Sequence, residues 1–379
     1  MSTIRTTQAN VPDDVINLGL GLPGFSLLPL EIMRQAAEHR LTQGDSSLLQ
    51  YGNEQGDGYF LLALADFLSE GYGVPVQADD LFVTGGNSQA LDLICTVFSQ
   101  PNDTVFVEEP TYFLALGIFA DYNLNVVPLP TDENGLVIEA LEEKLANQQP
   151  AFLYTVPTFH NPTGITLSQS RRERLVELSE EHNFLIVADE VYHLLNYATT
   201  PPPPPMGSYI ESETVLSIGS FSKILAPGLR LGWVQAAPAL LKRLILSGVV
   251  DSGGSLNHFT SGLVRSVLEL GLQRQHLAHL KTTYRQRIVA LNAALQEHMP
   301  NWVTFTKPEG GFFFWLHLPE EFDTKQLLAQ AAPHKVGWKP GIRFSAQQGL
   351  GNCMRLSFSF YDADTLKEGV QRLKQVIVP

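Results

Sequence analysis

The chain lacks the features of a membrane protein, a nucleic-acid binder or a secreted disulfide-linked protein. No apolar run approaches about 18 uninterrupted residues, so no membrane span is expected. Lys and Arg number 25 against 39 Asp and Glu, a formal net charge of −14, and no basic run is present to neutralise nucleic-acid or membrane phosphates. The two cysteines, Cys95 and Cys353, form no disulfide framework. With no apolar signal segment at the start, a reducing cytoplasm is the expected location.

Metal binding is not expected either, because the ten histidines show no spacing typical of metal ligands. The segment Gly19–Gly24 matches the G-x-G-x-x-G pattern of dinucleotide-binding proteins. In those proteins the pattern ends a strand and opens a helix directly. Here Pro23 interrupts it and Pro29 delays the helix, which excludes a nicotinamide site.

What the chain does have suits a large α/β protein. Its 379 residues are 44% hydrophobic and 17% charged, which is typical of a folded core. From about residue 80 to 250, strand-like apolar runs alternate with amphipathic helical segments. This alternation predicts a mostly parallel sheet covered by helices on both faces. We expect a large domain at 46–264, a smaller α+β domain at 265–379, and an N-terminal segment, 1–45, that packs against the smaller domain.

Polar and aromatic residues follow the predicted strands at the points where the strands end. The carboxyl ends of parallel strands meet at one edge of a sheet, where ligands bind. We therefore expect these side chains to converge on a single site. The residues concerned are Gly86, Asn87 and Ser88, then Tyr112, Asn161, Asp189 with Tyr192, and Lys223.

This set of groups fits one flat, anionic ligand. Asp189 would pair with a cationic ring nitrogen, Tyr112 would stack on the ring, and Lys223 would condense with an aldehyde. Glycines and a helix N-terminus would receive a phosphate. A phosphate, a pyridine nitrogen and an aldehyde together describe pyridoxal 5'-phosphate. The residues expected around the phosphate are Gly86, Asn87, Ser88, Ser220, Ser222 and Arg230.

Lys223 lies in the segment SFSKILAPGLRLGW with no acid nearby. Apolar surroundings and the neighbouring Arg230 both disfavour its ammonium form, so its pKa is expected below the usual value of about 10.4. A neutral amine is the form that acts as a nucleophile.

The sequence resembles the class I/II aminotransferases among the fold-type I pyridoxal-phosphate enzymes, and is most similar to the branch with 2-aminoadipate and kynurenine aminotransferases. The motifs that carry the resemblance are GLGLP, LLQYGNEQGD, VTGGNSQAL, VEEPTY, HNPTG, VADEVY, SFSKILAPGLRLGW, PEGGFFFW and MRLSFS. The resemblance implies a large domain with a seven-stranded sheet. It also implies transfer of an amino group from an L-amino acid to a 2-oxo acid, with 2-oxoglutarate as the expected acceptor, by a ping-pong mechanism.

The resemblance also assigns roles to residues. Lys223 would form the internal aldimine, with Asp189 and Tyr192 as its catalytic partners. The cofactor-binding set would be Gly86, Asn87, Ser88, Tyr112, Asn161, Asp189, Tyr192, Ser220, Ser222, Lys223 and Arg230, with Tyr51 reaching the phosphate of a neighbouring subunit in a homodimer with shared sites. Arg355, Gly21 and Asn161 would bind the substrate. One departure is Leu61, which stands where the family often has arginine.

Two alternatives stay open from the sequence. One is another pyridoxal-phosphate reaction on amino acids, such as β-elimination or racemisation, and the other is a non-catalytic regulatory module that binds the cofactor. The substrate side chain is also open. Leu22, Phe25, Leu27 and Leu28 lie near Gly21 and would favour aromatic, branched or long aliphatic substrates.

Overall fold

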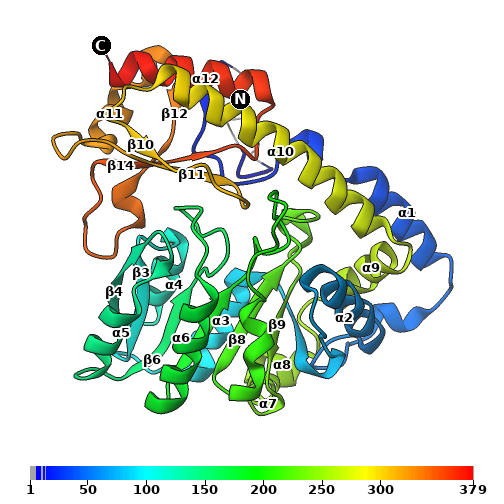
Figure 1. Ribbon diagram of the computed structural model, residues 1–379. Coiled ribbons are helices and arrows are strands. Elements are labelled where there is room, and N and C mark those ends of the chain that lie inside the picture. The colour runs from blue at the N-terminus through cyan, green and yellow to red at the C-terminus, as the bar shows by residue number, and fades with distance from the viewer. Residues whose placement is uncertain (1–5, 10–11, 13, 379) are drawn as a thin grey trace.

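A computed structural model describes residues 6–9, 12 and 14–378, and its centre is one large sheet (Figure 1). Five neighbouring strands run parallel, and β9 runs antiparallel to both β8 and β2, so β2 points the same way as β8. The order across the sheet is β2 (Leu81–Thr84), β9 (Gly232–Ala236), β8 (Val215–Ser220), β7 (Leu185–Asp189), β6 (Pro150–Thr155), β3 (Thr104–Glu109), β4 (Asn125–Asp132) and the two-residue β5 (Gly135–Leu136).

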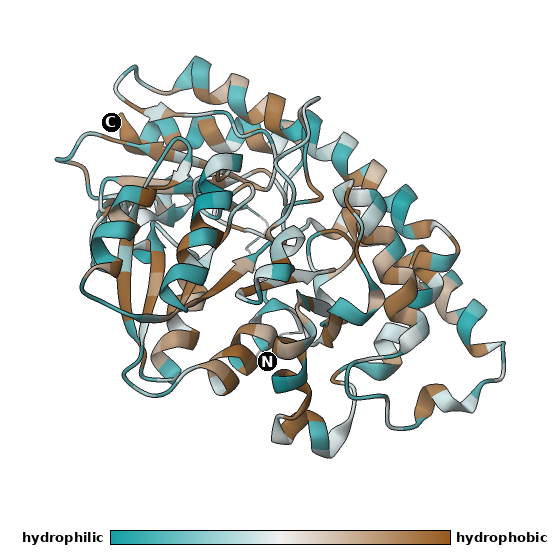
Figure 2. Ribbon diagram, turned by 60° about the horizontal axis from the view of Figure 1, so that its bottom comes forward, coloured by the Kyte–Doolittle hydropathy of each residue, from teal (hydrophilic) through white to brown (hydrophobic). Residues whose placement is uncertain are grey.

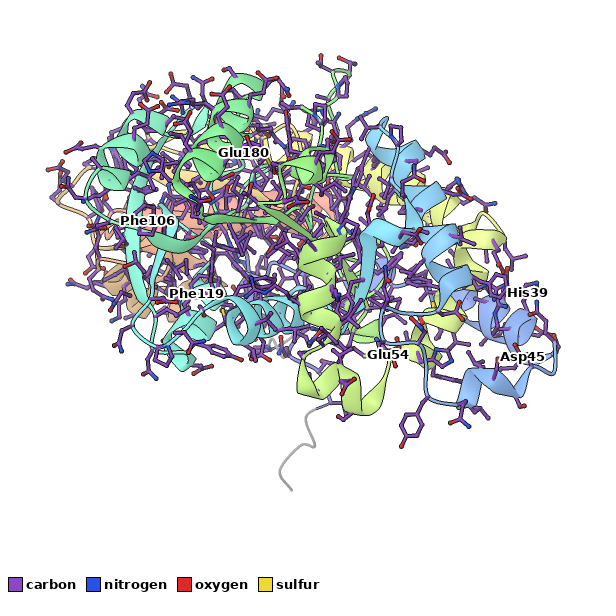
Figure 3. The ribbon with its side chains drawn as sticks, turned by 90° about the horizontal axis from the view of Figure 1, so that it is seen from below. His39, Asp45, Glu54, Phe106, Phe119 and Glu180 are labelled. Atoms are coloured by element: carbon purple, nitrogen blue, oxygen red, sulfur yellow. The ribbon has the colours of Figure 1, made fainter. Side chains whose placement is uncertain are left out.

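Alternating side chains of the central strands enter two separate apolar clusters. In β3, Val105 and Val107 belong to one cluster and Phe106 to the other. Phe106 and Phe119 mark the two clusters in Figure 3. Both faces of the sheet are therefore covered, which explains why these strands are mainly apolar, as Figure 2 shows by hydropathy.

Helices provide that cover. One cluster includes side chains of α2 (Gly58–Tyr72), α3 (Asn87–Phe98), α4 (Phe113–Asp121) and α7 (Pro238–Ile245), and the other those of α5 (Ile138–Leu145) and α6 (Gln169–His182). The short α8 (Gly248–Gly253) and then α9 (His258–Glu269) follow α7. This architecture confirms the predicted α/β fold with a helix-covered, mostly parallel sheet.

The C-terminal part forms a second, smaller sheet over the first. Its antiparallel order is β10 (Thr304–Phe305), β11 (Phe313–His317), β14 (Cys353–Ser357) and β13 (Lys339–Pro340). The N-terminal strand β1 (Ile16–Asn17) pairs in parallel with β12 (Val336–Gly337). The helices near this sheet are α10 (Leu272–His298), α11 (Thr324–Gln330) and α12 (Ala363–Ile377), whereas α1 (Leu30–Leu41) packs on α9.

The helix α10 runs along α12 at one end and approaches α9 at the other (Figure 1). It thus joins the two sheets into one body, and the domain boundaries at 45 and 264 stay predictions. The glycine pattern at 19–24 is followed only by the three-residue 3-10 helix Phe25–Leu27. The helix α1 begins later, at Leu30, directly after Pro29. Among the described residues, no helix has the length and apolarity needed to cross a membrane.

Arg172 on α6 is completely buried and ties several loops to the sheet. Its guanidinium donates to the carbonyl oxygens of Leu167, Pro204 and Pro157, at 3.0, 3.0 and 2.8 Å. It also lies 3.7 Å from the equally buried Glu190. Since Glu190 directly follows Asp189 at the end of β7, this buried pair supports the backbone on which Asp189 is carried.

Replacing Arg172 by Met should destabilise the protein strongly. The change would leave Glu190 as an unpaired buried charge, which costs roughly 3–5 kcal/mol. The measurement is the free energy of unfolding from urea denaturation of the cofactor-free protein. The matched control is Arg174→Met on the same helix, whose exposed ion pairs contribute less than about 1 kcal/mol. Equal losses in the two variants would contradict this account.

Candidate active site

Strands β2, β3, β6, β7 and β8 all end at the same edge of the large sheet. The residues that follow these ends are those singled out from the sequence. Close contacts described below join Asn87 to Asp189, Arg230 to Gly86, and Asn161 to Arg355. The structure therefore brings most of the predicted site residues together.

Asp189 is the buried acid at the centre of this edge, with a relative exposure of 4%. Its carboxylate accepts hydrogen bonds from Asn87 Nδ2 at 2.6 Å and from the Tyr154 hydroxyl at 3.0 Å. Burial raises the pKa of Asp189 to about 6, against the opposing effect of these two hydrogen bonds. A buried carboxylate of this kind gains from a cationic partner, such as a protonated ring nitrogen.

Tyr154 was not found by sequence reasoning, because it lies inside an apolar strand and reads as core. Alternation along β6 places it on the same side of the sheet as Asp189 on β7. Its hydroxyl fixes one carboxylate oxygen, so Tyr154 positions Asp189.

Lys223 follows β8 and its amine is enclosed. Its Nζ donates to the carbonyl oxygen of Gly21 at 2.9 Å and lies 5.7 Å from the centre of the Phe312 ring. Burial, followed by repulsion from Arg355, lowers the pKa of Lys223 to about 8, although Asp189 opposes this shift. The sequence-based expectation of an easily deprotonated lysine agrees with this environment.

The predicted phosphate-binding residues line the start of α3 and the turn after β8. Gly86 has φ of 92° and precedes the helix, whose first N–H groups have no side-chain cap. A Cβ on Gly86 would lie 3.1 Å from Arg230 Nη2, so the guanidinium lies directly against this glycine. Ser220 Oγ donates to Ser222 Oγ at 2.8 Å. This arrangement is suited to an anion.

Arg355 on β14 forms the opposite wall and is buried, with 3% exposure. It donates to Asn161 Oδ1 at 2.8 Å and to the carbonyl oxygen of Gly19 at 2.9 Å, while its Nε has no partner. A Cβ on Gly21 would lie 3.2 Å from Arg355 Nη2 and 2.9 Å from Phe313. A buried guanidinium without an acid partner can bind a carboxylate.

Two phenol rings flank this space. Tyr112 is half-buried, and burial followed by the charge of Asp189 raises its pKa to about 12. Tyr192 is almost fully buried and packs edge-on against Phe312 and Phe313. Burial raises the pKa of Tyr192 well above its ordinary value, so both phenols are neutral donors at neutral pH.

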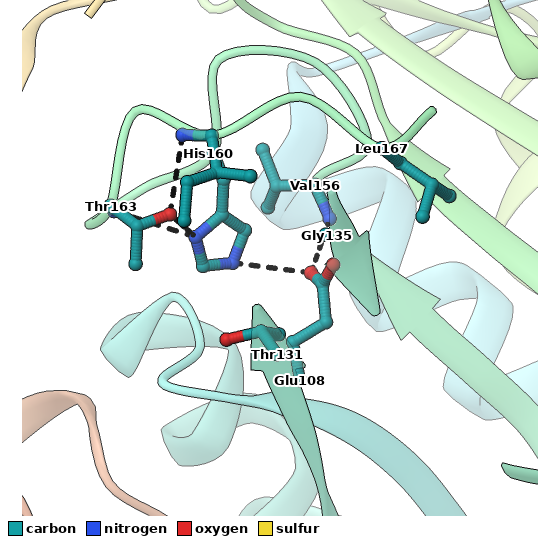
Figure 4. A pocket seen from close by; sticks show the side chains of 8 residues that line it. Glu108, Thr131, Gly135, Val156, His160, Thr163 and Leu167 are labelled. Carbon is teal, nitrogen blue, oxygen red and sulfur yellow. Dashed lines mark hydrogen bonds and ion pairs between the residues drawn. The ribbon is translucent and has the colours of Figure 1, made fainter. Parts of the chain in front are cut away.

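His160, which precedes Asn161 in the chain, makes a buried contact with Glu108 that sequence reasoning did not find (Figure 4). His160 Nε2 lies 3.1 Å from Glu108 Oε2, and His160 Nδ1 lies 2.9 Å from Thr163 Oγ1. The same glutamate oxygen accepts the Val156 N–H at 2.9 Å. His160 opens the turn HNPTG, residues 160–164. The structure adds that Glu108 on β3 anchors this turn and so positions Asn161.

Two predicted residues are not brought into the site within this chain. Tyr51 is 81% exposed and Ser88 is also exposed. Since the Ser88 side chain is exposed, Ser88 would bind a phosphate through its backbone N–H at the start of α3. The proposed role for Tyr51 needs a second subunit. Leu61, the departure from the family pattern, is buried in the core at 5% exposure.

The chain matches the family described as aminotransferase class I and II over residues 13–373. It belongs to this family. It is 39% identical to aromatic-amino-acid aminotransferase 1 of Thermococcus litoralis over 96% of this chain and 88% of that protein. It also resembles two solved structures. The kynurenine aminotransferase of Pyrococcus horikoshii has 36% identity and a TM-score of 0.90 over 96% of this chain and 91% of that one. The α-aminoadipate aminotransferase of Thermus thermophilus, complexed with N-(5'-phosphopyridoxyl)-L-leucine, has 30% identity and a TM-score of 0.87 over 96% and 92%.

Family membership confirms the predicted reaction class, transamination, and the cofactor, pyridoxal 5'-phosphate. The site residues fit this cofactor chemically. They offer an enclosed primary amine, a buried carboxylate that lacks a cationic partner, and a glycine and helix start beside an arginine. The roles of the individual residues remain proposals, taken up below.

The lowered pKa of Lys223 can be tested in the cofactor-free protein. Its amine should become reactive toward acetic anhydride with a midpoint near pH 8, because burial and Arg355 disfavour the charged form. Acetylation per residue would be measured by mass spectrometry from pH 6 to 11. The exposed Lys325 provides the internal control in the same samples. The same midpoint for both lysines would refute the environment described for Lys223.

Proposed function

We propose that this chain transfers an amino group from an L-amino acid to 2-oxoglutarate in two half-reactions at one site. The observation that carries the proposal is the Lys223 amine, which donates to the Gly21 carbonyl and is acted on by the charges of the buried Asp189 and the buried Arg355. These groups supply a base, a carboxylate that would keep a ring nitrogen protonated, and a clamp for the substrate carboxylate.

The substrate would be held by Arg355. Its guanidinium would take the α-carboxylate in a bidentate pair, with Asn161 fixing the guanidinium and Gly21 leaving room for the carboxylate. Orientation of this kind contributes to catalysis because the reacting atoms no longer have to find each other.

The cofactor would be held by the residues at the strand ends. Asp189 would accept the ring N–H, while Tyr192 and Asn161 would bind the ring oxygen and Tyr112 would stack on the ring. When bound, pyridoxal phosphate supplies an aldehyde that captures the amino group and a ring that accepts electrons from the substrate Cα. The phosphate set is Gly86, Asn87, Ser88, Ser220, Ser222 and Arg230, completed by Tyr51 of a second subunit.

Lys223 would move the proton. The lowered pKa of Lys223 makes its neutral amine more available, and that form can remove the proton from the substrate Cα and return it to a neighbouring carbon. Asp189 stays ionised beside a cationic ring, because an opposite charge lowers a carboxylate pKa. Tyr192 and Tyr112 stay neutral and can donate hydrogen bonds without changing charge.

We further propose a homodimer located in the cytoplasm. The cysteines Cys95 and Cys353 are both buried and free, which suits a reducing compartment. An exposed apolar patch lies on α1, α2 and the loop between them, and a monomer rarely leaves such a patch in water. Its centre is a groove lined by Tyr51, Tyr59 and Leu62, each more than half exposed. Leu30, Leu41 and Leu49 on the same elements are also more than half exposed.

Replacing Lys223 by Ala should abolish turnover. The variant keeps the substrate clamp but loses the group that moves the proton, so kcat should fall by at least about 10²–10⁴. The assay uses a panel of L-amino acids with 2-oxoglutarate and measures glutamate formation, with ammonia and pyruvate measured in parallel. Normal turnover by the variant, or release of ammonia in place of glutamate by the wild type, would contradict the proposed function.

A charge in the apolar patch should separate the subunits. Leu62→Glu is expected to reduce the mass in sedimentation equilibrium from twice 41.8 kDa to 41.8 kDa, and activity should fall because Tyr51 no longer reaches a partner. Val289→Glu on α10, also exposed but outside the patch, is the control. A wild-type protein that sediments as a monomer with full activity would exclude the shared site.

A further inference from the structure

Two cations on one face of the smaller sheet, Lys339 and Arg355, and a third in the turn that follows, Arg343, lie at the proposed substrate clamp. Lys339 on β13 is the direct antiparallel partner of Arg355 on β14, and residues directly opposite each other share one face with Cβ atoms about 4.5–5.5 Å apart. Arg343 lies four residues further on. Its guanidinium carbon is 5.1 Å from the centre of the Phe113 ring, and Lys339 Nζ is 5.7 Å from the same centre.

These cations have no acid to neutralise them. Among the described residues, no carboxylate oxygen lies within 4.0 Å of the charged nitrogens of Lys339, Arg343 or Arg355. The nearby Glu109 is engaged, since its carboxylate accepts hydrogen bonds from the Ser345 hydroxyl and from the Ala346 N–H at 2.9 Å. In a chain with 39 acids against 25 lysines and arginines, unpaired clustered cations require a reason.

Like charges in a cross-strand pair are destabilising. Lys339 is half-buried, and burial, then Arg343 and Arg355, lower its pKa. The protein thus tolerates an unfavourable arrangement that one bound anion would relieve. Arg355 can satisfy an α-carboxylate alone, so Lys339 and Arg343 point to a second anionic group.

Contacts between aromatic rings relate Lys339 and Arg343 to the proposed substrate site. Phe113 lies 5.8 Å from the Tyr112 ring and 5.2 Å from the Phe344 ring, centre to centre. The guanidinium of Arg355 lies 5.0 Å from the centre of Phe344. Lys339, Tyr112 and Arg355 thus all lie against the Phe113–Phe344 ring pair. A substrate side chain that extends from Arg355 along these rings would approach Lys339.

We infer that Lys339, with help from Arg343, binds the distal carboxylate of a dicarboxylic substrate such as glutamate or 2-oxoglutarate. This inference rests on the proposed function, since it places the α-carboxylate on Arg355. It also revises the expectation of a wholly apolar side-chain pocket. Leu27 is buried in the core, and Phe25 is 57% exposed and packs on Phe360, so neither is seen to line that space.

The first test compares substrates that differ by one carboxylate. In Lys339→Met, which keeps the length but removes the charge, kcat/KM for L-glutamate should fall at least about tenfold, the loss expected for one charge-assisted hydrogen bond. The value for L-leucine should stay within about twofold. Arg343→Met should show a smaller loss, because that side chain is exposed. Lys325→Met, an exposed lysine of the same domain, should change neither substrate.

The second test needs no turnover. Glutarate and pentanoate have the same carbon count but differ by one carboxylate, and calorimetric titration of the holoenzyme would compare their Kd values. Lys339→Met should weaken glutarate at least about tenfold and leave pentanoate unchanged. The variant should melt no lower than the wild type, because a repulsive pair has been removed.

Equal losses for glutamate and leucine, or an unchanged glutarate affinity, would overturn the role of Lys339. A wild-type protein without any half-reaction would instead overturn the proposed function. In that case the glutarate titration would still decide whether this cluster binds a second carboxylate.

Discussion

Everything at this site depends on a lysine amine that loses its proton easily because burial and neighbouring cations disfavour its charged form. The amine of Lys223 contacts the Gly21 carbonyl and the Phe312 ring. The positive charges of Arg355 and Arg230 lower its pKa further. Water would restore its usual pKa, and a neighbouring exposed acid would hold the proton on it. The site therefore has to be built from buried elements of both sheets. This explains why the N-terminal segment, the β8 turn and β14 all meet there.

Asp189, the acid whose charge acts on Lys223, differs from an ordinary ion-pair partner because neutral side chains hold it. Asp189 is fixed by Asn87 and Tyr154, so its carboxylate is oriented before any ligand arrives. Its raised pKa reflects burial without a full positive partner, which a ring N–H would provide. Buried contacts further from Lys223 fix the backbone of the site in a similar way. Glu190 and Arg172 hold the strand end, and Glu108 and His160 hold the turn that carries Asn161.

Unpaired cations at the site are unusual in a chain with a net charge of −14. Acids elsewhere pair with arginines on the surface, as in the contacts of Arg34 and Arg174. At the site, Arg355, Lys339 and Arg343 have no carboxylate partner among the described residues. A substrate with two carboxylates would meet a local positive field on a negative protein, which favours both binding and orientation.

The sequence by itself determined the alternation of strands and helices, the residues at the strand ends and the unpaired Lys223, because these depend on local pattern and on the rule that parallel strands end together. It could not show that Tyr154 reaches Asp189, since an aromatic residue in an apolar strand reads as core. Nor could it show Glu108 behind His160, about 50 residues apart in the chain. Only the tertiary structure placed Lys339 opposite Arg355, because strand register is set by packing across the sheet and not by neighbours along the chain.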